Sequence, residues 1–208
     1  MDLGERQGLT VLTFDAERHE YRVDGVLLPS VTQVLKPLQD FSMIAPAVLE
    51  HARQRGIAVH IAVQLDICND LVEESVAPEL AGYLQAWRAF RHDSGIHEAD
   101  FGDPEKPLYH PLYGFAGTPD VPFFFKKRWA VLDVKTADAL SPVWGLQTAA
   151  YLELINANTP KGHHKVVDRY SLRLRENGTY RLEQHTDKND WQVFLSCLTI
   201  HQWKGKNL

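Results

Sequence analysis

The chain has 208 residues, of which 44% are hydrophobic and 24% charged, and its formal net charge is −5. This composition is typical of a globular protein that builds its own core, and the negative charge argues against nucleic-acid binding through overall positive charge. Its two cysteines, Cys68 and Cys197, lie far apart in the chain, which argues against a disulfide framework, a zinc site and a four-cysteine iron–sulfur cluster.

Targeting and membrane segments are not expected. The start of the chain, MDLGERQGLT, lacks the basic and then apolar pattern of a signal peptide. No stretch reaches the roughly 18 apolar residues that a membrane span needs, so we expect an intracellular protein. Acidic residues outnumber basic ones in residues 1–120, and the reverse holds in 121–208. This split indicates either a local basic face that attracts phosphate or ordinary surface variation.

The N-terminal elements are a hairpin and a short helix. Residues 12–30, LTFDAERHEYRVDGVLLPS, contain two β-like runs around a turn at Asp24–Gly25. Residues 30–38, SVTQVLKPL, then predict a short helix with Ser30 or Thr32 as its cap.

Helical patterns follow. Residues 44–69 predict helical structure in two segments that are broken near Arg55–Gly56. Residues 78–95 carry apolar side chains at the i, i+3 and i+4 spacing of an amphipathic helix that starts at Pro78. Residues 96–113 are rich in turn signals, with a possible strand at their start.

The remaining chain alternates between strands and helices. The predicted elements are strands at 114–125 and 128–136, a helix at 141–157, a hairpin at 165–185 and a helix at 187–203. The basic turn of residues 126–128 joins the first two strands, Asn177–Gly178 forms the hairpin turn, and Asp187 caps the last helix. This order predicts an α/β or α+β fold in which helices flank a central mixed β-sheet.

Two acidic positions lie where predicted strands begin or end. Asp120 follows Gly-Thr-Pro, and Asp133-Val134-Lys135 comes thirteen positions later. Side chains alternate in a strand, so Asp133 and Lys135 share one face. Asp120, Asp133 and the Val134 carbonyl could bind Mg²⁺, and Lys135 could orient a water and stabilise charge on a phosphate. Alternatively, Asp120 is a turn residue and the other two form a solvated strand face.

The helix after the lysine adds a second motif. Its segment QTAAY places Gln147 and Tyr151 on one face. Together with GTPD and DVK, this set resembles the PD-(D/E)xK nuclease superfamily, in particular its RecB-like exonuclease branch without an iron–sulfur cluster. The resemblance implies that Gln147 and Tyr151 contact the metal-site strand or the DNA backbone. An ordinary amphipathic helix is the alternative.

Two upstream segments extend the resemblance. RGIAVH resembles the R-G-x-x-x-H helix of the family, which implies that Arg55 binds substrate and that His60 is a metal ligand. An imidazole ligand suits Mn²⁺ better than Mg²⁺. LPSVTQVL resembles a P-S-V-T segment, which implies that Ser30 and Thr32 touch a phosphate, although helix capping explains them equally well.

Three further positions are candidates. Gln64 stands where many relatives carry an acid, and Glu105 stands where some relatives have an acid before the G-T-x-D strand. Glu105 could equally be a solvated loop acid. Trp144, at the start of the Gln147 helix, could stack on an unpaired base.

The resemblance implies one nuclease domain over residues 1–208 with a restriction-endonuclease-like core. A hairpin and helical part (about 1–95) precedes the catalytic core (about 96–208). The implied activity is a Mg²⁺- or Mn²⁺-dependent DNA exonuclease of repair, recombination or phage replication, in the cytoplasm of a bacterial or phage-infected cell. We expect DNA that is single-stranded or has free ends, and a recombination or replication protein, as partners. A structure-specific endonuclease and a catalytically silent DNA-binding module remain alternatives.

Overall fold

The structure of the protein, a computed structural model, describes residues 10–137 and 139–208. The N-terminal segment MDLGERQGLT, for which no signal peptide is expected, lies outside these ranges except for Thr10. No helix in the described ranges is long and apolar enough to cross a membrane. The helices are α1 (Val31–Leu35), α2 (Pro46–Ile67), α3 (Ala81–Ser94), α4 (Val143–Asn158) and α5 (Asp190–Asn207). The strands are β1 (Leu12–Asp15), β2 (Glu20–Val23), β3 (Val26–Leu28), β4 (Leu108–His110), β5 (Phe115–Gly117), β6 (Val121–Phe125), β7 (Arg128–Lys135), β8 (Asp168–Leu174) and β9 (Tyr180–Gln184).

A four-stranded mixed sheet forms the centre of this α+β fold, as the sequence predicted. Its order is β6-β7-β8-β9, with β7 and β8 parallel and the other pairs antiparallel. Parallel neighbours need a long crossover, and α4 provides it. The turns predicted at residues 126–128 and at Asn177–Gly178 join the two antiparallel pairs, and Arg128 already belongs to β7.

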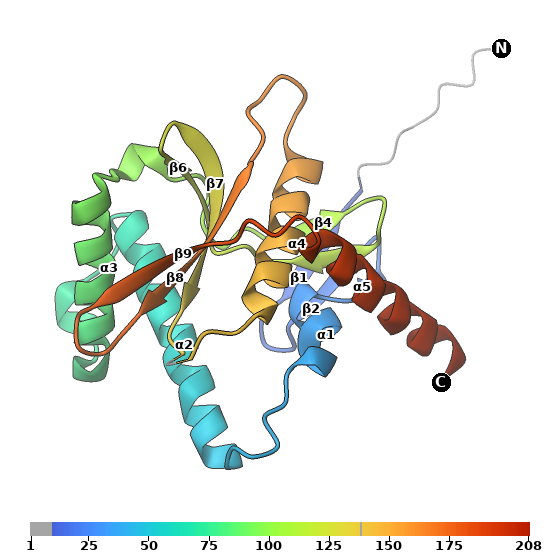
Figure 1. The fold of residues 1–208 in the computed structure, drawn as a ribbon, viewed down its shortest axis with the longest axis horizontal. Helices are drawn as coiled ribbons and strands as arrows, with labels where there is room; N and C mark the ends of the chain where they lie inside the picture. The colour runs from blue at the N-terminus through green and yellow to red at the C-terminus, as the bar shows by residue number, and fades with distance from the viewer. Residues whose placement is uncertain (1–9, 138) are drawn as a thin grey trace.

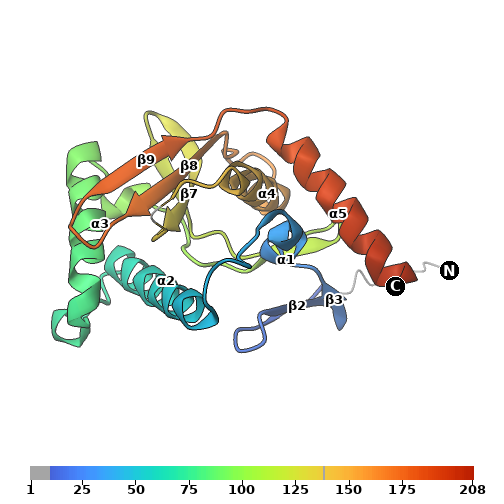
Figure 2. The ribbon, with the colours of Figure 1, turned by 60° about the horizontal axis from the view of Figure 1, so that its bottom comes forward.

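Helices cover both faces of the central sheet. The helices α2 and α3 lie on one side, and α4 and α5 lie on the other (Figures 1 and 2). Leu132 and Val134 belong to the core beneath α2 and α3, whereas Val131 packs with α4 and α5. Strand β7 is therefore buried on both faces, which explains its nearly continuous apolar sequence.

The N-terminal region contains three strands, where the sequence predicted two. The predicted turn at Asp24–Gly25 connects β2 and β3, and an additional strand, β1, pairs with β2. The β1–β2 turn has no glycine; instead, His19 adopts a positive φ of 53°. The Asp15 carboxylate also accepts backbone hydrogen bonds from Glu17 and Arg18, which stabilises this turn.

The predicted break near Arg55–Gly56 is wrong, because α2 is continuous. One glycine inside a helix costs about 1 kcal/mol, which the burial of Val59, Val63 and Ile67 outweighs. A Cβ at Gly56 would meet Thr136 Oγ1 at 3.6 Å, so α2 passes close to the end of β7.

Three other boundaries differ from the predictions. The possible strand at the start of 96–113 is a 3-10 turn at Glu98–Asp100. The predicted strand at 114–125 is split into β5 and β6, which belong to different sheets. The N-cap position of the last helix is Asn189, which makes no side-chain cap bond, and Asp187 Oδ1 accepts the Asn189 N–H at 2.8 Å before the helix begins.

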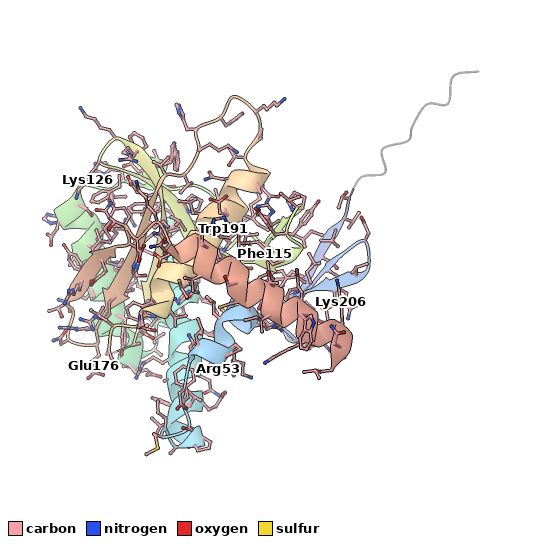
Figure 3. The ribbon with its side chains drawn as sticks, turned by 45° about the vertical axis from the view of Figure 1, so that its right-hand side comes forward. Arg53, Phe115, Lys126, Glu176, Trp191 and Lys206 are labelled. Atoms are coloured by element: carbon pink, nitrogen blue, oxygen red, sulfur yellow. The ribbon has the colours of Figure 1, made fainter. Side chains whose placement is uncertain are left out.

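The start of α5 is anchored by an ion pair and an aromatic cluster. Arg169 donates to Gly145 O at 2.7 Å and lies 2.9 Å from Asp190 Oδ2, which ties α5 to α4. Trp191 packs on Phe115, with ring centroids 6.2 Å apart (Figure 3). These contacts fix α4 against the central sheet, where it meets the candidate site.

Candidate active site

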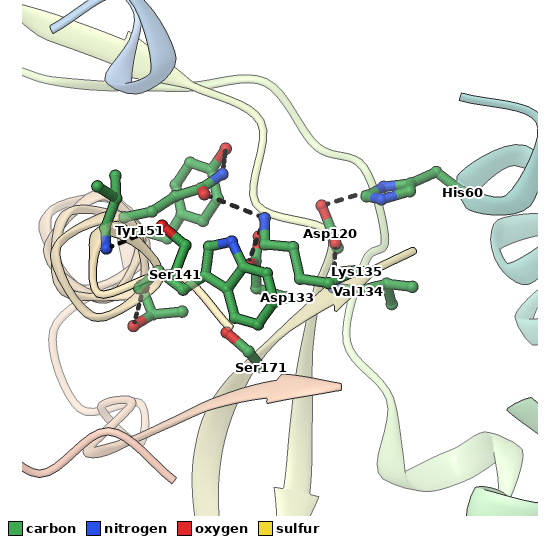
Figure 4. A network of polar contacts seen from close by, with 12 residues as sticks. His60, Asp120, Asp133, Val134, Lys135, Ser141, Tyr151 and Ser171 are labelled. Carbon is green, nitrogen blue, oxygen red and sulfur yellow. Dashed lines mark hydrogen bonds and ion pairs between the residues drawn. The ribbon is translucent and has the colours of Figure 1, made fainter. Parts of the chain in front are cut away.

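Asp120 occupies the junction between two parts of the site. It precedes β6, and because Val121 lies opposite Leu132, Asp120 reaches the carboxyl end of β7. Its Oδ2 accepts a hydrogen bond from the Val134 N–H at 2.5 Å. Its Oδ1 lies 3.4 Å from His60 Nδ1 on α2 (Figure 4). The main chain of β7 and the side chain from α2 therefore hold the same carboxylate.

One group of potential metal ligands lies on the α2 side. His60, Glu105 and Asp120 each offer one ligand atom, and these atoms lie within 4.8 Å of one another. Glu105 adopts a positive φ of 49°, and its N–H donates to Asp120 O at 2.8 Å. A cavity of about 10 Å³, which Gln64 also lines, lies beside these residues. It has about the space needed for one water molecule.

The three groups are electrostatically coupled. Burial would lower the pKa of His60, but the carboxylates of Asp120 and Glu105 overcome it and raise that pKa to about 10. Burial opposes ionisation of Asp120, yet His60 and Lys135 keep its pKa below the ordinary value. Burial raises the pKa of Glu105. The imidazolium thus balances two carboxylates at the position where a divalent cation could replace its proton.

Asp133 lies on the opposite side of β7, facing α4. It is 0% exposed, and its Oδ2 is 2.7 Å from Lys135 Nζ. Within the described ranges, neither of its oxygens has a partner with hydrogen-bond geometry. Burial raises the pKa of Asp133 to about 6, against the attraction of Lys135 and with help from the negative charge of Asp120. Asp133 does not belong to the compact ligand group around His60.

Lys135 connects Asp133 to α4. Its Nζ donates to Gln147 Oε1 at 3.0 Å, and Gln147 Nε2 donates to Tyr151 Oη at 3.1 Å. Burial, reinforced by the charges of Asp133 and Asp120, raises the pKa of Tyr151. The expected i, i+4 pair therefore shares a face, Gln147 contacts the lysine, and the Tyr151 phenol stays protonated.

Ser30 and Thr32 lie on α1. Ser30 is buried and forms a capping box, in which its Oγ accepts the Gln33 N–H at 3.1 Å. The exposed Thr32 has its Oγ1 3.1 Å from Ser30 Oγ. Their contacts within α1 are those of a helix cap, which was one of the two interpretations of this segment.

Arg55 contacts a residue outside the ligand group, and Trp144 is buried. The guanidinium of Arg55 lies over the ring of Tyr83 on α3, 5.7 Å from its centroid. Trp144 is buried in the first turn of α4, with 6% of its surface exposed. Burial leaves the indole little surface on which a base could stack.

Tyr21 and Thr118 were missed by the sequence analysis. Tyr21 lies on β2 and is 1% exposed, and its Oη is 2.8 Å from Thr118 Oγ1, two residues before Asp120. Burial raises the pKa of Tyr21 to about 12, although the bond to Thr118 opposes this and the charge of Glu105 adds to it. Nothing local in the sequence links a hairpin tyrosine to a loop 97 residues away.

Comparisons with known protein families and with curated proteins found no match to this chain. Its function is therefore inferred from the residues and geometry of the site.

Proposed function

We propose that this protein is a metal-dependent nuclease that hydrolyses phosphodiester bonds in DNA. We also propose that it belongs to the PD-(D/E)xK superfamily, with β6–β9 and α4 as its restriction-endonuclease-like core. The observation that carries the proposal is the complete burial of the Asp133 carboxylate, which its ion pair with Lys135 at 2.7 Å compensates only in part, close to the buried Asp120. A solvated strand face would instead leave these carboxylates exposed to water.

The residues fit a divalent cation. Burying a carboxylate without hydrogen bonds is unfavourable unless a cation compensates its charge. Lys135 does so only in part, because the pKa of Asp133 remains raised to about 6. Asp120, Glu105 and His60 would hold the ion, and its charge would also act on Asp133, as that of Asp120 does. Two oxygen donors with one imidazole suit Mn²⁺ or Mg²⁺. When bound, the ion would activate water and neutralise charge on the phosphate.

The chain's own side chains would position the reacting groups. Lys135, held between Asp133 and Gln147, places a fixed positive charge where charge develops on the phosphate. The bond from Gln147 to Tyr151 fixes the amide, so that Lys135 needs no rearrangement during reaction. The Val134 N–H holds Asp120 in place and leaves its second oxygen for the ion. Among the possible modes of cleavage we favour an exonuclease, on the resemblance to the RecB-like branch.

Cleavage assays with a matched control test the proposal. End-labelled linear single- and double-stranded DNA and closed circles would be incubated with Mn²⁺, with Mg²⁺ and with EDTA. Lys135→Ala should lower cleavage at least about 100-fold. Lys106→Ala should leave it unchanged, because Lys106 is exposed and paired with Asp103 at 2.8 Å.

Each outcome separates the alternatives. Metal-dependent loss of linear DNA with intact circles supports the exonuclease, and cutting of circles supports an endonuclease. DNA binding without cleavage by the folded wild type would indicate a silent module. Equal activity of Lys135→Ala and wild type would contradict the proposed site.

A further inference from the structure

The strand register places three cationic residues in one row. Lys135 on β7 lies opposite Arg173 on β8, and Arg173 lies opposite Arg181 on β9. Residues opposite each other on paired strands point to the same face. Lys135, Arg173 and Arg181, here called the cationic row, therefore start at the proposed site and cross the sheet to its β9 edge.

The other face of the same strands confirms this orientation. Leu172 and Leu174 are buried in the core beneath α2 and α3, and Leu182 packs against that core. Because side chains alternate, Arg173 and Arg181 point to the opposite face, which also carries Lys135. Arg173 is 5% exposed, whereas the Arg181 side chain is 55% exposed, so the row runs from the interior to the surface.

Charged groups of both signs surround the row, since Asp133 pairs with Lys135 at 2.7 Å at its inner end. The guanidinium of Arg181 lies 3.0 Å from Glu183, which holds it along β9. On the same face of β8, two residues before Arg173, Ser171 Oγ is 2.9 Å from His185 Nε2. The pKa of His185 is lowered, first by burial and then by the positive charges of Arg169 and Lys135, against the negative charges of Asp190 and Glu183.

We propose that the cationic row attracts the phosphodiester backbone of the strand being cut, with Arg181 as its exposed contact, so that this strand leaves the metal site towards the β9 edge of the sheet. The proposal rests on the proposed nuclease function and adds the path of the substrate. Arg181 lies two interstrand spacings, about 10 Å, from Lys135, so these two side chains can reach different phosphates of one strand. Arginine suits this role, because its planar guanidinium can donate two parallel hydrogen bonds to a phosphate.

Salt-dependent binding of a single-stranded oligonucleotide tests the path. Affinity would be measured in EDTA, which prevents cleavage, for wild type, Arg181→Gln and Arg22→Gln. Arg22 is a matched control, since it is also half-exposed on a strand and lies 2.9 Å from an acid two residues away, Glu20. Losing one phosphate contact should reduce the slope of log affinity against log salt by about 0.7. Arg181→Gln should show this reduction, whereas Arg181→Lys and Arg22→Gln should keep the wild-type slope.

The outcomes separate this proposal from the nuclease function. Cleavage by wild type together with an unchanged slope for Arg181→Gln would overturn the path and leave the nuclease intact. A reduced slope in a protein that never cleaves would support the path on a silent module. If wild type neither cleaves nor binds the oligonucleotide, both proposals are overturned. Thermal unfolding of each variant shows that a changed slope does not reflect loss of the fold.

Discussion

Replacing Asp133 with asparagine should stabilise the protein in EDTA and abolish the proposed cleavage of DNA. The carboxylate is fully buried, and neither oxygen has a partner with hydrogen-bond geometry in the described part of the chain. Asparagine has nearly the same shape but no charge, so the desolvation of the charge disappears. Function and stability would therefore change in opposite directions at this position.

The size of the effect follows from the pKa of Asp133, about 6 in the folded chain against an ordinary 3.8. A difference of about two pKa units corresponds to about 3 kcal/mol of stability lost by ionisation above pH 7. The substitution leaves Lys135 without its ionic partner, which offsets part of the gain. We expect a net gain of about 1–2 kcal/mol, or about 2–8 °C in Tm for a chain of this length.

Thermal unfolding in EDTA at pH 5 and pH 8, followed by circular dichroism, measures this gain. The pKa of Asp133 is raised in the folded chain, so protonation of this carboxyl stabilises the fold. This contribution to stability is complete below about pH 4. That contribution is lost as the pH rises through about 6. The difference in Tm between Asp133→Asn and wild type should thus be about half as large at pH 5 as at pH 8, where it is complete. Saturating Mn²⁺ should raise the Tm of wild type more than that of the variant.

Asp168→Asn provides the control. Asp168 is a 15% exposed acid at the start of β8 that pairs with Arg128 at 3.1 Å, far along the strand from the proposed site. Its loss should lower stability by up to about 1 kcal/mol and leave cleavage unchanged. If Asp133→Asn also lowers Tm at pH 8, the Asp133–Lys135 pair stabilises the fold and our reasoning about the buried carboxylate is refuted.

Two further substitutions test the α2 side and the N-terminal sheet. His60→Gln should weaken Mn²⁺ binding at least about tenfold and Mg²⁺ binding less, because Mg²⁺ prefers oxygen donors. Unchanged affinities for both ions in a metal titration would show that His60 is not a ligand. Tyr21→Phe breaks the bond to Thr118, and it should lower stability by about 1 kcal/mol and reduce kcat for DNA cleavage without changing KM. A wild-type kcat would mean that Tyr21 only packs the N-terminal sheet and does not position Asp120.

Patterns with local causes could be predicted from the sequence. The continuous apolar run of β7 indicates a strand buried on both faces, and the i, i+4 spacing of Gln147 and Tyr151 places them together on α4. Asn177–Gly178 marks the hairpin, whose turn also determines that Arg173 and Arg181 are opposite each other. In each case neighbouring residues determine the geometry.

Contacts between distant segments could not be predicted in this way. The pairing of Lys135 with Arg173 depends on the register of the parallel strands β7 and β8. A long crossover through α4 joins these strands, and no tight turn between them sets their register. Glu105 reaches His60 because its backbone adopts a positive φ, which a lone glutamate in a loop does not signal. Tyr21 reaches Thr118 only through the placement of a separate sheet.

The pleat of β7 explains why an apolar residue stands between the acid and the lysine. The side chain of Val134 packs in the core beneath α2 and α3, and its N–H holds Asp120. Asp133 and Lys135 consequently point to the other face, where α4 supplies Gln147. One strand thereby separates the ligand group on the α2 side from the lysine on the α4 side, and the Val134 N–H connects them through Asp120. A polar residue at position 134 would weaken the core contact that holds this part of β7 in place. We therefore attribute the apolar residue between Asp133 and Lys135 to the geometry of the site.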